Sequence, residues 1–127
     1  MGTIDELFVE MDQLMDQLFR RLDPFQVAYS AWRPKVDVYE LSDRIVVVAE
    51  LGGVHREDIR LSMLGNELVI AGIRRTPSPA DTIAVHQLEI ECGRFMRRLR
   101  LSRRIDRQDV RAVFVDGLLT IEILLRS

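Results

Sequence analysis

Few residues of this chain are suited to catalysis or metal binding, and they are scattered along it. The 127 residues include one cysteine, Cys92, and two histidines, His55 and His86. One cysteine cannot form an internal disulfide, and these three side chains lack the paired spacings of metal ligands in proteins. We therefore expect neither a disulfide nor a metal site.

The sequence also lacks the short motifs of common catalytic sites. Its single lysine, Lys35, follows a proline, so it cannot belong to a Gly-x-x-x-x-Gly-Lys-Ser/Thr phosphate loop. No Gly-x-Ser-x-Gly, Cys-x-x-Cys or His-Glu-x-x-His occurs, and the neighbouring carboxylates at 57–58 and at 89 and 91 are of the exposed kind. These features favour a binding protein over an enzyme.

A local run of arginines raises the question of nucleic acid. Eight arginines lie within Arg94–Arg111, although the net charge of the chain is −2. The alternating glycine and aromatic pattern of RNA-binding strands is absent, and acids elsewhere cancel the positive field. We expect no nucleic-acid partner and interpret residues 94–101 as a strand. A basic amphipathic helix over 94–108 is the alternative, weakened by Gly93 and Ser102.

Strand alternation in this segment places a charge on the apolar side. Phe95, Leu99 and Leu101 share one face with Arg97. A buried arginine requires a partner, because an unpaired charge is expensive to remove from water. The candidate carboxylates are Asp81, Glu89 and Glu91.

The N-terminal residues have helical periodicity. Thr3 and Glu6 form a capping box, and Pro24 ends the pattern. We predict an amphipathic helix with an apolar stripe that must pack against something, whether a binding partner or another subunit through a heptad seam. The stripe consists of Ile4, Leu7, Phe8, Met11, Leu14, Met15, Leu18, Phe19 and Leu22.

From about Trp32 the apolar pattern changes to period two, which predicts strands. The spacing of the strands and turns is that of an antiparallel β-sandwich rather than of βαβ units. At the C-terminus, Asp116-Gly117 joins two β-branched and aliphatic segments and predicts a hairpin with a type I′ turn. The expected strands cover 36–40, 44–50, 59–63, 68–72, 94–101, 111–115 and 118–123.

With these elements placed, the chain resembles the small heat-shock proteins, whose α-crystallin domain is an immunoglobulin-like β-sandwich. The match spans about residues 32–124. The expected fold is all-β, with an N-terminal amphipathic arm over 1–31, the sandwich over 32–125 and almost no C-terminal extension (126–127). The motifs are Trp32-x-Pro34-x-Val36-Asp37-Val38-Tyr39-Glu40, Ala49-Glu50-Leu51-Gly52-Gly53-Val54 with Glu57-Asp58-Ile59, Leu68-x-Ile70-x-Gly72, Gly93-Arg94-Phe95-x-Arg97-x-x-Arg100-Leu101 and Ala112-x-x-x-Asp116-Gly117-Leu118-Leu119.

The resemblance implies an ATP-independent holdase that binds partly unfolded client proteins and prevents their aggregation, without cofactor or catalytic residue. The alternative is an adaptor sandwich that docks on a larger ATP-driven chaperone. No segment is long and apolar enough to span a membrane, and no secretion signal is present, so we expect a cytoplasmic protein.

The resemblance also implies surfaces. The arm stripe would bind clients, and an apolar groove would include Ile59, Leu61, Met63 and Val113. In the bacterial and plant branch a loop segment, here Asp81–Leu88, pairs with strand 36–39 of a neighbour and forms a homodimer. The implied interface residues are Val36, Val38, Ile83, Val85, Arg97 and Arg100.

The chain departs from the family pattern at three places. Gly52 and Ser102 stand where proline is usual. The chain ends directly after the last strand. Ile121-Glu122-Ile123 matches the Ile-x-Ile/Val motif of the family's C-terminal anchor but lies within that strand. Because the anchor normally fills the neighbour's groove and builds large oligomers, assembly beyond the dimer is left open and the groove is expected to be unfilled.

Overall fold

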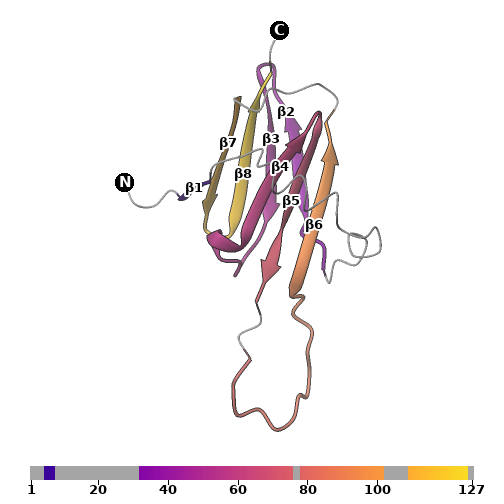
Figure 1. Cartoon of the computed structure of the whole chain (residues 1–127), viewed down its shortest axis with the longest axis vertical. Helices are drawn as coiled ribbons and strands as arrows, with labels where there is room; N and C mark the ends of the chain where they lie inside the picture. Colours follow the sequence, from indigo (N-terminus) through magenta and orange to yellow (C-terminus); the bar gives the residue numbers. More distant parts are fainter. Residues whose placement is uncertain (1–4, 8–31, 76–77, 102–108, 126–127) are drawn as a thin grey trace.

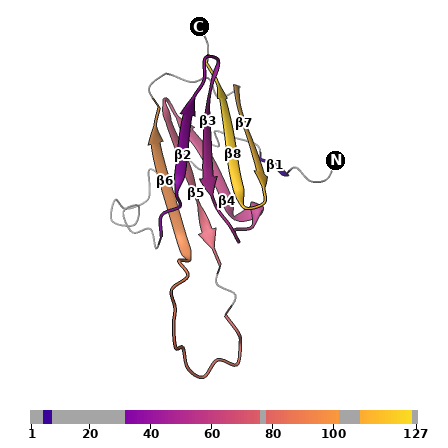
Figure 2. The same ribbon diagram turned by 180° about the vertical axis from the view of Figure 1, so that it is seen from behind.

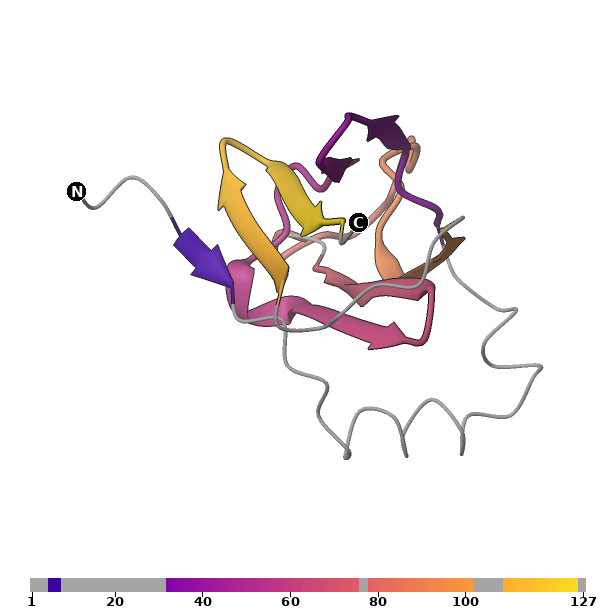
Figure 3. The ribbon, with the colours of Figure 1, turned by 90° about the horizontal axis from the view of Figure 1, so that it is seen from above.

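Two antiparallel sheets form the fold (Figure 1). The computed structural model describes residues 5–7, 32–75, 78–101 and 109–125. The larger sheet has the strand order β1-β7-β8-β3-β2, and the smaller has the order β4-β5-β6. The sheets lie face to face, as the view from behind and the view from above also show (Figures 2 and 3). The predicted all-β sandwich is confirmed.

The strands follow the predicted period-two segments closely. A single 3₁₀ turn, η1 (Arg56–Asp58), precedes β4. The strand bounds are β1 Asp5–Leu7, β2 Val36–Glu40, β3 Arg44–Glu50, β4 Ile59–Leu64, β5 Glu67–Arg74, β6 Gly93–Arg100, β7 Val110–Val115 and β8 Leu118–Leu124.

The core lies between the sheets and is formed by alternate residues of each strand. In β3 and β8 every second side chain is buried, because successive side chains point to opposite faces of a sheet. Strands β4 and β5 supply the opposing layer through Ile59, Leu61, Met63, Leu68 and Ile70, although some of their outward side chains are buried as well. The buried cluster includes Ile45, Val47, Ala49, Leu51, Ile59, Leu61, Met63, Leu68, Ile70, Phe95, Leu119, Ile121 and Ile123.

The β7–β8 hairpin turns as its sequence predicts. Asp116 has φ 54° and Gly117 has φ 78°, the pair of positive values that a type I′ turn requires. Asp116 is the only non-glycine residue of the described chain with positive φ. Strand β8 pairs with β3 along its whole length, so this hairpin joins the C-terminal strands to the centre of the larger sheet.

Strand β1 corrects the N-terminal prediction. The helical pattern assigned residues 5–7 to the amphipathic helix, but they form a strand that pairs with β7 in the register Asp5↔Phe114 to Leu7↔Ala112. The physical reason is that β7 otherwise leaves a row of unpaired backbone groups at the sheet edge, which a strand can satisfy. The rest of the predicted helix, Ile4 and residues 8–22, lies outside the described residues.

Gly72 allows β5 to approach its neighbours closely, which leads to a first prediction. A Cβ at this position would overlap the Asp58 carbonyl oxygen and the Phe95 ring. We expect Gly72→Ala to lower the free energy of unfolding by about 2–3 kcal/mol, because both neighbours are fixed in the sandwich. Urea unfolding at fixed protein concentration measures the change.

Gly52→Ala is the matched control, because nothing lies within 4 Å of a Cβ at that position. Its effect should stay below about 1 kcal/mol. Equal losses in the two variants would contradict the close approach at Gly72.

Candidate functional site

The long loop between β5 and β6 is the most exposed part of the described chain. It leaves the sandwich at one end and projects away from both sheets (Figures 1 and 2). Its apolar side chains lie in solvent, with Ile83 101% and Ile90 82% exposed, and Val85 and Leu88 are also exposed. Several exposed apolar side chains on one segment indicate an interaction site, whereas single exposed apolar residues are common on any protein surface.

Strand β2 offers a second exposed feature, an open sheet edge. It pairs with β3 on one side and has no described strand on the other. Val38 and Tyr39 are about half exposed, whereas Val36 packs against the core. Unpaired backbone donors and acceptors at such an edge can accept a further strand. The edge of β2 and the apolar loop thus complement each other chemically.

Arg74 and Trp32 hold the base of the loop. The Arg74 guanidinium lies 3.8 Å from the centre of the Trp32 ring and donates from Nε to the Glu91 carbonyl at 2.8 Å and from Nη1 to the Gly52 carbonyl at 3.1 Å. Trp32 Nε1 donates to the Gly93 carbonyl at 2.9 Å. This cluster, here called the loop clamp, ties both ends of the loop to the sandwich.

An ion pair next to the loop clamp joins Arg75, the residue after β5, to Asp58 of η1. Arg75 contacts both carboxylate oxygens of Asp58, at 2.9 and 3.1 Å. These hydrogen bonds hold the pKa of Asp58 below its usual range and raise that of Arg75. Because the pKa of Asp58 is lowered in the folded state, the stabilisation is present at neutral pH and is lost as pH falls through that lowered value.

Arg97 lies on the core-facing side of β6, as predicted, beside buried Phe95 and Leu101. The predicted carboxylate partner is wrong for the described chain: Arg97 Nη1 donates to the Pro34 carbonyl at 2.7 Å, and its Nε is buried without a hydrogen-bond partner. Burial, with a smaller effect from Arg33, lowers the pKa of Arg97. Asp81, Glu89 and Glu91 belong to the loop between β5 and β6, and all three are exposed.

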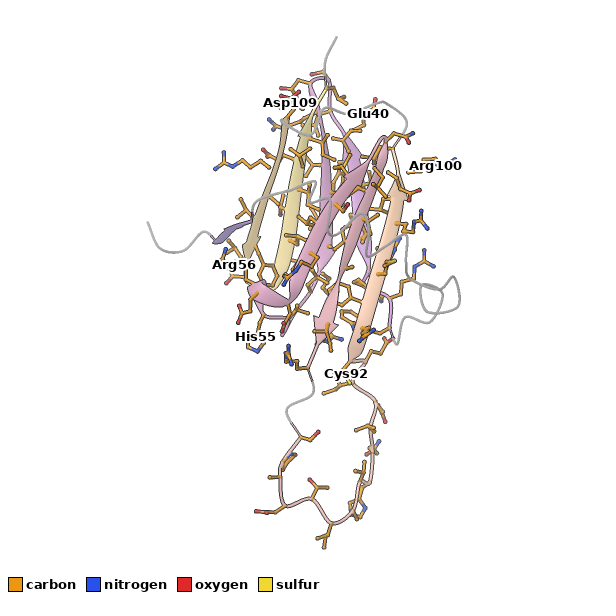
Figure 4. All side chains as sticks on the ribbon, in the orientation of Figure 1. Glu40, His55, Arg56, Cys92, Arg100 and Asp109 are labelled. Carbon is orange, nitrogen blue, oxygen red and sulfur yellow. The ribbon has the colours of Figure 1, made fainter. Side chains whose placement is uncertain are left out.

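Arg100, at the far end of β6, is exposed and points away from the sheet (Figure 4). Its cross-strand neighbour is Glu67, which instead accepts a hydrogen bond from Arg98 Nε at 2.7 Å. Strand β6 over residues 93–100 also replaces the alternative basic helix, which is wrong for this segment.

Three of the four predicted groove residues are core residues in this chain. Ile59, Leu61 and Met63 are buried and belong to the core cluster, whereas Val113 is half-buried. Glu6 of β1 pairs with Val113, so the edge of β7 beside the predicted groove is occupied. A client-binding groove at these residues remains a prediction.

The candidate metal ligands do not converge in the part of the chain that the structure describes. No three His, Cys, Asp or Glu side chains there form a cluster that could hold a metal ion. Cys92 and His55 are labelled in Figure 4 at the same end of the sandwich, on different segments, and His86 is exposed on the loop. No helix of the described chain has the length and hydrophobicity needed to cross a membrane.

An immunoglobulin-like sandwich with an open edge strand and a projecting apolar loop defines a protein that presents binding surfaces. The model of the Hsp20/alpha crystallin family matches residues 37–127. The chain therefore belongs to this family, the small heat-shock proteins, whose members are chaperones.

Relatives from plants and bacteria support the assignment. The 19.0 kDa class II heat shock protein of Oryza sativa subsp. japonica is 34% identical over an alignment of 135 residues, gaps included. The alignment covers 92% of this chain and 77% of the relative. The spore protein SP21 of Stigmatella aurantiaca is 26% identical over 126 residues, which cover 91% and 72%.

Solved structures agree with these relatives. A small heat-shock protein from Xylella fastidiosa has a TM-score of 0.69 and 33% identity, covering 77% of this chain and 90% of that one. The hspA protein from Xanthomonas axonopodis has a TM-score of 0.67 and 32% identity, covering 75% and 95%.

The loop clamp generates the second prediction. We expect Arg74→Ala to lower the free energy of unfolding by about 2–3 kcal/mol, because it removes charge-assisted hydrogen bonds to two carbonyls and the contact with Trp32. It should also speed hydrogen exchange at residues 89–92, because the loop loses its attachment. Urea unfolding and exchange mass spectrometry measure the two effects.

Arg98→Ala is the matched control on the neighbouring strand. Its ion pair with Glu67 is largely exposed, with 55% of the Arg98 side chain accessible, so the loss should stay below about 1 kcal/mol. An Arg74 variant that behaves like the Arg98 variant would show that the clamp contributes little.

Proposed function

We propose that this protein is an ATP-independent holdase that binds partly unfolded proteins in the cytoplasm and keeps them from aggregating. The observation that carries the proposal is the family match over residues 37–127, together with the apolar stripe of the N-terminal residues. A protein that shields apolar segments of others needs apolar surface of its own, and shielding by reversible contact consumes no nucleotide.

The N-terminal stripe is the proposed client-binding surface. The stripe includes two methionines, whose unbranched and flexible side chains adapt to irregular client surfaces. Clients differ in sequence but share exposed apolar segments, so a surface of this kind suits binding without sequence specificity.

The loop and the edge of β2 support a homodimer formed by strand exchange. Residues 81–88 of one chain would pair with β2 of the other, bringing Ile83 and Val85 against Val36 and Val38. Pairing would satisfy the free backbone groups of β2 and remove the loop's apolar side chains from water. Arg97, whose Nε lacks a partner in the described chain, and exposed Arg100 would support this interface from β6.

Light scattering from a heat-aggregating client, without nucleotide, tests holdase activity. We expect a several-fold molar excess of the protein to suppress aggregation, because each bound client segment is withdrawn from self-association. Undiminished scattering would rule out the holdase and favour an adaptor that acts only through a larger chaperone.

Substitutions in the arm locate the client site without disturbing β1, which a deletion would remove. Leu14→Glu with Leu18→Glu places two charges on the stripe and should reduce suppression several-fold, because charges are costly against an apolar client. Gln13→Glu with Gln17→Glu adds the same charge off the stripe and should leave suppression unchanged. Equal suppression of aggregation by the two double variants would show that clients bind elsewhere than on the stripe.

Sedimentation tests the dimer. We expect Ile83→Asp to raise the dimer dissociation constant at least about tenfold, because a buried isoleucine contributes about 1.5–3 kcal/mol. Ile90→Asp, on the same loop but outside residues 81–88, is the control and should sediment as the parent does. If the Ile83 variant dimerises as strongly as the parent, residues 81–88 do not form the dimer interface.

A further inference from the structure

The outer face of the three-stranded sheet, the face turned away from the core, has an apolar centre. Because Leu61 and Ile70 belong to the core, their neighbours along the strands point outward. In the outward rows, Ser62 of β4 lies opposite Val69 of β5, and Ala71 of β5 lies opposite Met96 of β6. We call these four residues the outer patch.

Three of the four outer-patch residues are buried and Met96 is half-buried, although the opposite sheet cannot reach them. Ser62 is 0%, Val69 2% and Ala71 9% exposed, yet none of them belongs to the core cluster. Ser62 lies on an edge strand, where an outward side chain would normally contact water, and it has an interaction partner. No described strand or helix lies against this face (Figure 3).

The outer face of the larger sheet provides an internal comparison. Val48 and Thr120 point outward from its two central strands, between flanking strands on both sides, and they remain half-buried only. A residue on an edge strand of the smaller sheet is therefore more deeply buried than residues at the centre of the larger one. The described strands therefore do not by themselves account for the burial of Ser62 and Val69.

The course of the chain indicates which segment could cover the outer patch. Leu7 ends β1 at the β7 side of the sandwich, and Trp32 lies at the other flank, bonded to Gly93 of β6. Figure 1 shows β1 and β6 on opposite flanks, with β4 and β5 between them. Residues 8–31 must connect the two flanks. Crossing three strands takes about 10 Å, and a helix of residues 8–22 would be about 22 Å long, so the length is sufficient.

Charge and composition agree with the same segment. Exposed Arg60, Arg94 and Arg98 border the outer patch, whereas residues 1–22 carry five acids and two bases. The other long segment outside the described residues, 102–108, has one apolar residue, and Arg100 and Asp109 on either side of it lie toward the same end of the sandwich (Figure 4). It offers little to cover an apolar patch at mid-strand.

We propose that the apolar stripe of residues 8–22 docks on the outer patch of its own chain. The stripe then has two competing partners, the outer patch and an unfolded client, and a client must displace the patch to bind. The docking stands on its own, whereas this competition rests on the proposed holdase function. The fold thus contains a resting site for its own client-binding segment.

Thiol protection tests the docking in the full chain, in a Cys92→Ser background, without any client. We expect Ser62→Cys to react with a maleimide at least about tenfold more slowly than Thr120→Cys on the outer face of the larger sheet, because covered groups react only through local opening. Adding Leu14→Glu and Leu18→Glu should remove the protection, and adding Gln13→Glu and Gln17→Glu should keep it. Added salt should weaken the protection, because it screens the arginines.

Several outcomes would overturn the docking. These are fast reaction of Ser62→Cys in the parent arm, protection that survives the two stripe charges, and protection lost on dilution, which would assign the cover to a second copy. Ala71→Cys repeats the measurement at an independent position, with circular dichroism as the check on folding. Hydrogen exchange along β4 in the chain without added cysteine gives the same comparison if both cysteines disturb the fold. Suppression of client aggregation is measured separately, so either proposal can fail without the other.

Discussion

An open sandwich leaves backbone groups unpaired at the edges of its sheets, and most features of this chain follow from how those edges are treated. Among the described strands, β1, β2, β4 and β6 are the edges. Strand β1 occupies the side of β7, while β2 keeps its outer side open. An unpaired edge invites another strand, so a protein that retains one must direct it to a chosen partner or risk aggregation. A chaperone that works among unfolded chains is under this constraint more than most proteins.

The arginines of the chain show how context decides the role of one side chain. Arg74 and Arg97 both donate to backbone carbonyls. Arg74 spreads its donors over two segments and stacks on Trp32, so it fixes a loop base. Arg97 is partly desolvated beside the core and keeps one nitrogen without a partner, which costs free energy within a single chain. Arg98 lies on the surface in an ion pair of small net value.

Local patterns predicted the fold well, because alternation and turn chemistry act over a few residues. The strands, the type I′ turn at Asp116 and the placement of Arg97 on the core face follow from spacing alone. The helical pattern failed for residues 5–7, since an unpaired sheet edge overrode local preference. The partner of Arg97 and the contacts of Trp32 with Arg74 depend on residues about 40 to 60 positions away, and no local signal specifies such contacts. The burial of Ser62 was unpredicted for the same reason.

Trp32 is the only tryptophan of the chain, and its position gives it a spectroscopic use. Its ring is buried, packs on Phe95 with ring centres 5.1 Å apart and carries the Arg74 guanidinium on its face. The indole therefore lies where the N-terminal segment enters the sandwich and where both ends of the loop meet. Indole emission depends on solvent access and on nearby charge, so the intrinsic fluorescence of the unlabelled protein monitors this junction, and a change in either segment is recorded by one native chromophore.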